Sequence, residues 1–573
     1  MKNIESLREL YDYSVMRYSN NLMSKMLDSD VEYTYSNFRI KCEELSLKLS
    51  KYGVGAGDKV AILSQNMPNW GLAFFTTVAF GRVSVPILPD SSANEVDNIL
   101  QHSQTKAIFI SRRLFSLLSE RSREAVSMII DVETLEVLKG ESQEFAATKV
   151  PAPEELATII YTSGTTGNAK GVMLSHRNLA SCVVSCYHTK KRDERDRWLS
   201  ILPMSHTLEL TIGLLYPAYC GASVYYMSKP PVPKLLLSAM REVRPTTMLS
   251  VPLIIEKIYR DSIVPTIRKS PTLSWLDKNM NWLLCRLIGL KLRKTFGGKL
   301  DFFGIGGAKL DVEVEKFLLK ARFPYAVGYG LTETSPLLSF TLGKTRVPGS
   351  IGVPVYGVEL KLDNINPQTG EGEIVAKGPN VMMGYYKDAE RTAKVFNSDG
   401  WFKTNDLAVL DAKGNYSIRG RLSNMILGSS GENIYPEEIE QVINNIDVVD
   451  ESIVLSRGNK LVALVTFNED VLDWDHSGEA EFLKKVEECK SNILSIVNGK
   501  VNRSSRTHTF GSQLAYLTVN QTFESTVDTH NLKSIVNRAA SHRANASIHS
   551  GRIATRCKHT YSFNFFFHKY VIH

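Results

Sequence analysis

Apolar and polar positions along the first 350 residues follow a pattern typical of layered α/β domains. Short runs rich in β-branched residues predict buried strands, as at Lys59–Ser64 and Val83–Ile87, and longer stretches with helical spacing separate them, as at Ser36–Tyr52. This alternation favours largely parallel sheets covered by helices. A further helix, Ser92–Gln101, and six further strands are predicted, enough for two sheets: Ala107–Ser111, Thr158–Tyr161, Ser200–Leu202, Ala222–Tyr226, Thr246–Val251 and Phe302–Gly304.

The pattern changes twice after Gly349. Short strands and turns first predict a β-rich subdomain, and a compact α+β pattern follows Arg421. We therefore expect a large N-terminal domain at 1–420, made of two α/β subdomains plus the β-rich subdomain. We expect a small and incomplete α+β C-terminal domain at 421–505. The predicted elements are strands Val358–Leu362, Gly372–Ala376, Leu407–Asp411, Tyr416–Arg419, Ile453–Ser456 and Lys460–Phe467, and helix Tyr435–Val442.

The last segment, 506–573, differs from the rest of the chain. It holds eight Lys or Arg against two Asp or Glu, so it carries +6 of the formal charge of +8. Seven of the twelve His lie there, and no packing period is visible. Disorder and a shifted reading frame are the two interpretations of this basic tail. Because the remaining residues carry only +2, a nucleic-acid partner is not expected.

Composition places the chain among ordinary globular proteins, with 43% hydrophobic and 22% charged residues. Its 573 residues exceed the roughly 250–300 that one core holds, so we expect two or more domains. The seven Cys are scattered, which is typical of a reducing compartment. No secretory signal and no long apolar span is visible, so a cytoplasmic location is expected, with peripheral membrane contact left open.

The strongest motif, YTSGTTGNAKG, runs from Tyr161 to Gly171 and follows a predicted strand. Its glycines let the backbone curl so that N–H groups point inward, its hydroxyls add donors, and Lys170 adds a positive charge. Such a loop suits a polyphosphate, and it is not the Walker pattern. The alternative is a Ser/Thr/Gly-rich surface loop. The loop residues concerned are Thr162, Ser163, Gly164, Thr165, Thr166 and Gly167.

This residue order resembles the adenylate-forming superfamily of AMP-forming acyl-CoA synthetases, and the resemblance continues in chain order to residue 440. Asp301–Lys309 (DFFGIGGAK) resembles the strand and turn that packs against adenine, which implies contacts from Gly307 and Ala308. Gly328–Pro336 (GYGLTETSP) resembles the pattern YGxTE. There the resemblance implies that Tyr329 and Gly330 lie at the adenine, that Thr332 contacts the α-phosphate, and that Glu333 holds Mg²⁺ with Thr162.

Three later segments extend the resemblance. Trp401–Leu407 (WFKTNDL) implies that Asp406 binds both ribose hydroxyls, although Asn405 replaces the usual Gly. Ile418–Arg421 implies that Arg421 contacts the nucleotide. Gly428–Glu440 resembles the start of the C-terminal lid, with Gly431 at a CoA channel, and Ser423 stands at the hinge where Asp or Lys is common.

The resemblance implies two half-reactions, with ATP, Mg²⁺ and CoA as cofactors or co-substrates. A carboxylate first attacks the α-phosphate of ATP, which gives acyl-AMP and pyrophosphate. The CoA thiol then attacks the acyl-AMP. Long-chain fatty acid–CoA ligases are the most similar members. Lys170, Thr332, Glu333 and His206 are the predicted catalytic residues, with His206 near the substrate carboxylate; a buried core histidine is the alternative for His206.

The segment between Pro271 and Phe296 predicts a basic amphipathic helix. Its two interpretations are a helix that meets membrane or fatty acid and a helix packed on the body with its cations reaching to solvent. The apolar positions at helical spacing are Leu276, Met280, Leu283, Leu287 and Leu290, and the interleaved cations are Lys278, Arg286, Lys291, Arg293 and Lys294.

The C-terminal lysine of the family has no clear counterpart. Lys533 is a weak candidate, and no Pro supports it. Impaired adenylation is therefore a hypothesis. Two alternatives to a fatty acid–CoA ligase stay open: an acyl-AMP ligase that loads an acyl-carrier protein, and a catalytically impaired remnant that binds nucleotide without turnover.

Overall fold

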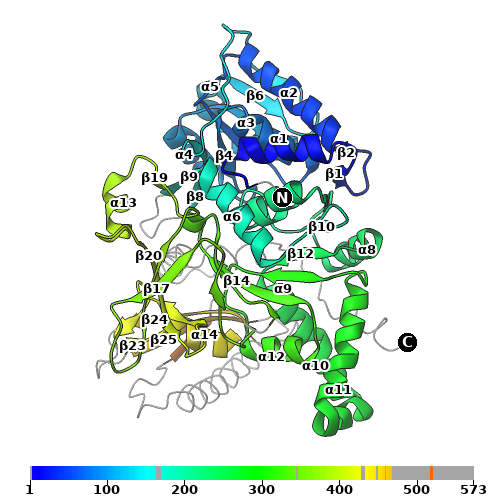
Figure 1. The fold of residues 1–573 in the computed structure, drawn as a ribbon. Coiled ribbons are helices and arrows are strands. Elements are labelled where there is room, and N and C mark those ends of the chain that lie inside the picture. The colour runs from blue at the N-terminus through cyan, green and yellow to red at the C-terminus, as the bar shows by residue number, and fades with distance from the viewer. Residues whose placement is uncertain are drawn as a thin grey trace, which may run out of the picture.

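The computed structural model describes residues 3–162, 170–343, 346–427, 433–444, 446, 449–457, 460–467 and 516–519. These residues form two large sheets covered by helices, a four-stranded sheet and a smaller C-terminal sheet (Figure 1). The predicted α/β class is confirmed, with two α/β subdomains, a β-rich subdomain and a small α+β part. The predicted domain boundaries stay predictions.

The first sheet has eight strands in the order β19-β9-β8-β4-β3-β5-β6-β7. Its centre is parallel, and all five residues of β4 are buried, as expected of a sheet covered on both faces. Helices α3 and α4 pack against this centre. The strands are β3 (Lys59–Leu63), β4 (Val83–Ile87), β5 (Thr105–Ile110), β6 (Met128–Asp131), β7 (Val137–Lys139), β8 (Leu156–Thr162), β9 (Lys170–Ser175) and β19 (Gly384–Tyr385).

Local signals set the helices of this part. Ser92 and Glu95 form a capping box that starts α4, and Pro68 occupies the first turn of the buried α3, where a missing N–H costs nothing. The helical segments are α1 (Leu7–Arg17), α2 (Tyr35–Lys51), α3 (Pro68–Val78), α4 (Ala93–Ser103), η1 (Arg112–Leu117), α5 (Glu120–Ala125) and α6 (His176–Thr189).

The second sheet has nine strands in the order β16-β15-β14-β13-β12-β10-β11-β1-β2. From β14 to β1 every neighbouring pair is parallel. The strands are β1 (Leu22–Met26), β2 (Glu32–Thr34), β10 (Arg197–Ser200), β11 (Ser223–Tyr226), β12 (Thr247–Ser250), β13 (Phe302–Ile305), β14 (Tyr325–Gly330), β15 (Leu337–Phe340) and β16 (Val353–Pro354).

The helical segments around this sheet include two π-helical stretches, η2 and η3, a form often found at functional sites. They are η2 (Glu209–Leu215), α7 (Tyr216–Cys220), α8 (Pro233–Val243), α9 (Pro252–Lys257), η3 (Ile258–Ile263), α10 (Val264–Lys269), α11 (Pro271–Thr295), α12 (Val312–Lys320) and η4 (Thr332–Thr334). Figure 1 shows α11 at the lower right margin of the molecule.

The β-rich subdomain is a four-stranded antiparallel sheet, β17-β18-β20-β21, and a three-stranded sheet, β24-β25-β26, follows in the C-terminal part. Strand β26 belongs to the predicted tail and pairs parallel with β25. The elements are β17 (Glu359–Asp363), β18 (Gly372–Lys377), α13 (Ala389–Val395), β20 (Phe402–Leu410), β21 (Tyr416–Arg421), β22 (Ile426–Leu427), β23 (Asn433–Ile434), α14 (Pro436–Asn444), β24 (Val449–Arg457), β25 (Lys460–Phe467) and β26 (Tyr516–Val519).

One predicted strand is displaced. The apolar run predicted Ser200–Leu202, whereas β10 spans Arg197–Ser200. The chain has left the sheet by Leu202, whose carbonyl accepts a hydrogen bond from the Asn66 side chain at 2.6 Å. A side-chain partner therefore replaces the strand ladder there.

Candidate active site

Lys170, Glu333 and Tyr385 meet in one buried cluster, although they come from three elements, β9, η4 and β19. The Lys170 ammonium lies 2.6 Å from Glu333 Oε1 and donates to the Tyr385 hydroxyl at 3.0 Å. The Tyr385 hydroxyl in turn donates to Glu333 Oε1 at 2.8 Å. The structure thus brings together two predicted residues 163 positions apart and adds a third.

The electrostatics of this cluster keep Glu333 ionised. Burial alone would raise the pKa of Glu333, but the charge and hydrogen bond of Lys170 lower that pKa to about 2. Burial also raises the pKa of the Tyr385 phenol, so this hydroxyl stays a donor. The cluster therefore holds one negative charge, on Glu333, and one positive charge, on Lys170. A ligand that separated the pair could bind to each.

Thr162 lies directly opposite Lys170 in the β8–β9 pair. Its Oγ1 is buried and has no hydrogen-bond partner among the described residues. The remaining residues of the predicted phosphate loop, Ser163, Gly164, Thr165, Thr166 and Gly167, lie outside the described residues. The two ends of the loop are thus anchored beside Glu333.

A second polar cluster joins Asp406, Arg421 and Tyr329. Asp406 and Arg421 are register partners across β20 and β21, and Arg421 Nε lies 3.0 Å from Asp406 Oδ1. The Tyr329 hydroxyl donates to Asp406 Oδ2 at 2.7 Å. Burial raises the pKa of Asp406, while the charge of Arg421 opposes that rise. The aromatic ring, the carboxylate and the guanidinium predicted for the nucleotide therefore lie together.

The departure at Asn405 has a structural explanation. Asn405 has φ 64°, a left-handed conformation that Gly adopts freely and Asn tolerates better than most residues. Its side-chain amide donates to the Ser423 hydroxyl at 2.8 Å. The two positions that depart from the family pattern are therefore bonded to each other, and the carboxylate of Asp406 keeps its place.

Five of the predicted site residues line one cavity of about 580 Å³, open space at its mouth included. Gly307, Tyr329, Gly330, Thr332 and His206 line it. A Cβ on Gly330 would lie 1.6 Å from the Pro336 carbonyl oxygen, so only Gly fits there. Ala308, the next residue after Gly307, is exposed. The apolar side chains of the lining are Leu208, Ile212, Leu249, Phe302, Ile305, Leu331, Pro336, Leu337 and Phe340.

Two titratable groups lie beside this cavity, the half-buried His206 and the fully buried Glu209. Burial lowers the pKa of His206 to about 4, so its imidazole is neutral. Burial raises the pKa of Glu209, in the π-helix η2, to about 8, and a hydrogen bond with Ser200 offsets this only in part. At neutral pH both side chains are therefore uncharged.

A second cavity, of about 360 Å³ with open space at its mouth included, adjoins the first. Ile212, Phe302, Leu337 and Phe340 line both, so these four side chains form the partition between them. The rings of Phe302 and Phe340 are stacked, with centroids 5.7 Å apart. The two cavities are therefore separated by an apolar partition.

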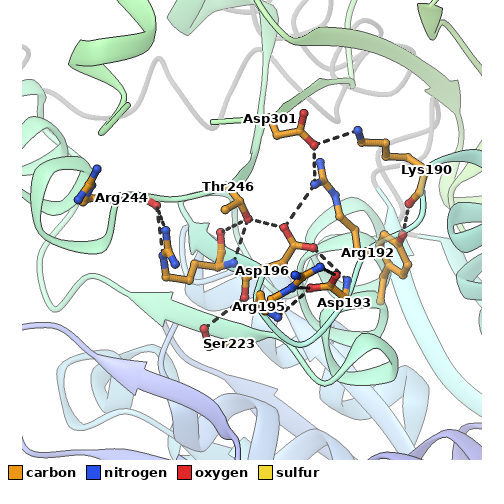
Figure 2. Close-up of polar contacts among 11 residues, drawn as sticks. Lys190, Arg192, Asp193, Arg195, Asp196, Ser223, Arg244, Thr246 and Asp301 are labelled. Atoms are coloured by element: carbon orange, nitrogen blue, oxygen red, sulfur yellow. Dashed lines mark hydrogen bonds and ion pairs between the residues drawn. The ribbon is translucent and has the colours of Figure 1, made fainter. Parts of the chain in front are cut away.

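Figure 2 shows an ion-pair network around Arg192. Arg192 also lines the second cavity. Arg192 Nη1 lies 2.8 Å from Asp301 Oδ2 and 3.3 Å from Asp196 Oδ1, and Lys190 pairs with Asp301 at 2.9 Å. The Arg192 guanidinium also lies 5.5 Å from the centroid of the Phe302 ring. The network therefore fixes Arg192 against the partition.

The donor set fits a substrate-bridged magnesium ion. Among the described residues, no three His, Cys, Asp or Glu gather into a metal cage. Mg²⁺ commonly takes only one or two carboxylates and fills its sphere with water and substrate phosphates. The ionised Glu333 and the buried Thr162 hydroxyl match that requirement.

Sequence reasoning missed Tyr385 and the burial of Glu209. Tyr385 stands in a GYY segment with no motif around it, and only the antiparallel pairing of β19 with β9 places it beside Lys170. Glu209 stands three residues after the predicted His206, but the charge of a glutamate alone predicts exposure. Gly431 and Lys533 lie outside the described residues.

Replacing Lys170 by Met should destabilise the fold because Glu333 would be buried without its cation. We expect a loss of about 3 kcal/mol, as for broken buried ion pairs, and a smaller loss in the Lys170→Met/Glu333→Gln double variant. Urea unfolding measures both. Lys316→Met, which removes an exposed pair with Glu313, should change stability by less than about 0.5 kcal/mol. Strictly additive losses in the double variant would contradict the coupling.

Replacing Glu209 by Gln should change how stability depends on pH. The folded carboxyl titrates at about 8 and the unfolded one near 4.5, so the unfolded state releases its proton first as pH rises. The wild type therefore loses about 1.4 kcal/mol per pH unit across that window, and the variant does not. Unfolding between about pH 4 and pH 8 tests this, with the exposed Glu44→Gln as control. Parallel profiles for wild type and Glu209→Gln would refute it.

Comparison with known families matches residues 13–386 to the AMP-binding enzyme family. The chain is 30% identical over 491 residues to the peroxisomal long chain acyl-CoA synthetase 6 of Arabidopsis thaliana, covering 77% of this chain and 69% of that protein. It is 27% identical over 563 residues to a chloroplastic long-chain-fatty-acid–[acyl-carrier-protein] ligase of the same plant, covering 81% and 77%.

A solved structure shares the fold. It is the O-succinylbenzoate coenzyme A synthetase of Bacillus subtilis in complex with ATP and magnesium ion, with a TM-score of 0.68, 22% identity, and coverage of 89% of this chain and 95% of that one. The family match spans more than half of the chain and the plant synthetase more than two thirds of it. The chain therefore belongs to the AMP-binding enzyme family, that of the adenylate-forming acyl-CoA synthetases.

Proposed function

We propose that this chain activates a fatty acid to acyl-AMP with release of pyrophosphate and then transfers the acyl group to the thiol of CoA, releasing AMP. One observation carries the proposal. The Lys170–Glu333–Tyr385 cluster and the Asp406–Arg421 pair each adjoin a residue that lines one apolar cavity, because Thr332 precedes Glu333 and the Tyr329 hydroxyl donates to Asp406. Groups that suit a phosphate chain and a ribose thus adjoin space that suits an alkyl chain.

In the first step, a substrate carboxylate oxygen attacks the α-phosphorus and the bond to the bridging oxygen of pyrophosphate breaks. Lys170 leaves Glu333 and neutralises the phosphate oxygens, and the Thr332 hydroxyl donates to the α-phosphate. The neutral His206 imidazole orients the carboxylate without adding charge. Asp406 and Arg421 hold the ribose, and the Tyr329 ring lies against the adenine.

Glu333 and Thr162 would hold Mg²⁺, which supplies positive charge beside the phosphates. In the second step the CoA thiolate attacks the acyl carbonyl carbon, and AMP leaves with the bridging oxygen. The Asn405–Ser423 hydrogen bond lies at the predicted hinge, so lid rotation between the steps would have to break it.

Two alternatives remain. The first has a different acceptor for the acyl group, and the second has no catalytic turnover. One relative is named as a ligase that uses an acyl-carrier protein, which keeps a carrier acceptor open for this chain. The second is a nucleotide-binding remnant, motivated by the weak candidate Lys533. The ionised Glu333 and the paired Asp406 support turnover over the remnant.

ATP–pyrophosphate exchange over straight-chain acids of rising length tests the activity. We expect exchange that depends on the acid and falls by about a thousandfold in Glu333→Gln, because a charge that stabilises the transition state is lost. CoA and a holo-carrier protein are then compared as acceptors. ATP binding without exchange for any acid would establish the remnant instead.

We also propose that helix α11 contacts a membrane surface. Its Leu284, Cys285, Gly289 and Leu292 are buried, and a Cβ on Gly289 would lie 2.2 Å from the Ala321 carbonyl oxygen, so this face is packed tightly on the body. The opposite face is apolar and exposed at Trp282 (62%), Leu287 (51%) and Leu290 (65%), and Trp275 (58%), which precedes a kink at Met280, is exposed as well. No described helix is long and apolar enough to cross a bilayer.

The charge of this segment specifies an anionic partner. Residues 278–300 contain six Lys or Arg and no Asp or Glu. Exposed indole rings and interleaved cations are typical of helices that lie in the interface of an anionic bilayer. The predicted apolar stripe thus faces outward at Leu287 and Leu290 and is not the packed face.

Sedimentation of the full chain with vesicles tests this contact. Binding should require anionic lipid, weaken with salt, and fall at least about tenfold in Trp282→Ser/Leu290→Ser. The control Met16→Ser/Leu47→Ser changes two residues that are 73% and 56% exposed on other helices and should leave binding unchanged. Equal loss in both pairs, or no vesicle binding by the wild type, would overturn the contact.

A further inference from the structure

The second cavity contains polar groups that its neighbours leave unsatisfied. Arg192, Trp198 and Thr247 all line it, and their side chains are at least nine-tenths buried. Arg192 Nη2, Trp198 Nε1 and Thr247 Oγ1 have no hydrogen-bond partner among the described residues. Buried polar atoms without a partner are costly and few in native proteins, so three around one cavity indicate a ligand.

Strand register places two of these groups in one row with the partition. Trp198 on β10 is the register partner of Thr247 on β12, and Thr247 is the partner of Phe302 on β13. Residues in register on adjacent strands project from the same face of a sheet. The row Trp198–Thr247–Phe302 therefore forms one wall, which begins at the partition and leads into the second cavity.

The three unsatisfied groups, on Arg192, Trp198 and Thr247, favour a ligand with an oxygen atom that accepts hydrogen bonds. An indole N–H and a guanidinium N–H only donate, and a threonine hydroxyl can also donate. The charge of Arg192 is already offset, because its Nη1 is paired with Asp196 and Asp301. A second carboxylate on the ligand would add a charge that nothing balances. An uncharged hydroxyl or carbonyl oxygen fits.

We propose that the second cavity is a subsite for an oxygen substituent on the acyl chain, so that the preferred acid is a hydroxy or oxo fatty acid. The inference rests on the proposed activation of a fatty acid, whose chain passes the Phe302–Phe340 partition to reach the subsite. An unsubstituted chain that fills the cavity leaves the three donors unsatisfied, whereas an oxygenated chain satisfies them.

Binding to the full-length wild type tests the subsite without turnover. The probes are straight-chain saturated acids of one length, unsubstituted or carrying a hydroxyl at successive positions, titrated by calorimetry in the presence of a nonhydrolysable ATP analogue. We expect one hydroxyl position to lower Kd about ten- to hundredfold relative to the unsubstituted acid. Thr247→Val should reduce that preference at least about threefold by weakening only the hydroxy acid.

The control Thr76→Val makes the same change at a fully buried hydroxyl on α3, outside both cavities, and should keep the wild-type preference. Trp198→Phe gives a second reading if Thr247→Val fails to fold. Equal affinities for hydroxylated and unsubstituted acids, or a preference that both Thr247→Val and Trp198→Phe retain, would mean that the cavity holds only ordered water and would overturn the subsite.

The outcome separates the subsite from the activity. Exchange with unsubstituted acids but no hydroxyl preference would refute the subsite and leave the ligase function standing. A hydroxyl preference in binding, together with no pyrophosphate exchange for any acid, would support the subsite and refute the ligase function.

Discussion

The ion pair between Lys170 and Glu333 is the constraint on which the site depends. It joins β9 of the first sheet to η4 beside the second, and Tyr385 of β19 completes it. Without a ligand, each charge is the counter-ion of the other, so neither is buried alone. A phosphate chain with its metal would replace both partners at once: the cation turns to phosphate and the carboxylate to metal. In the proposed function, the interaction that holds the subdomains together at this point would therefore be the one that substrate binding exchanges.

In the cluster of Asp406, Arg421 and Tyr329, a buried carboxylate is again paired with a cation, but here two neighbouring strands hold the pair. Asp406 and Arg421 face each other because they are opposite residues of one antiparallel pair, so their spacing is set by the ladder and not by a loop. Asn405 supports this geometry from its left-handed position and connects it to Ser423. A change of hinge angle must therefore act directly beside the carboxylate predicted to hold the ribose.

Sequence patterns were sufficient for the fold class and for the groups that belong to ordered motifs. Lys170, Glu333, Asp406 and Arg421 are recognisable because each stands in a run whose order is informative. Tyr385 is not, since its role arises from the pairing of β19 with β9, more than 200 residues apart in sequence. The outward face of α11 was also not predictable, because helical spacing gives a stripe but not the side on which the body packs.

The same four-residue strand determines both ends of the proposed acyl path. Phe302 begins β13 and forms part of the partition, and Gly306 and Gly307 follow its end and line the cavity beside Tyr329. A strand rises about 3.3 Å per residue, so roughly 13 Å separates the nucleotide end from the row that Phe302 shares with Thr247. An acid with a shorter chain would stop before the three donors and gain nothing from them. Selectivity for an oxygen substituent should therefore arise only in chains long enough to pass the partition, which couples chain length and oxygenation through one strand.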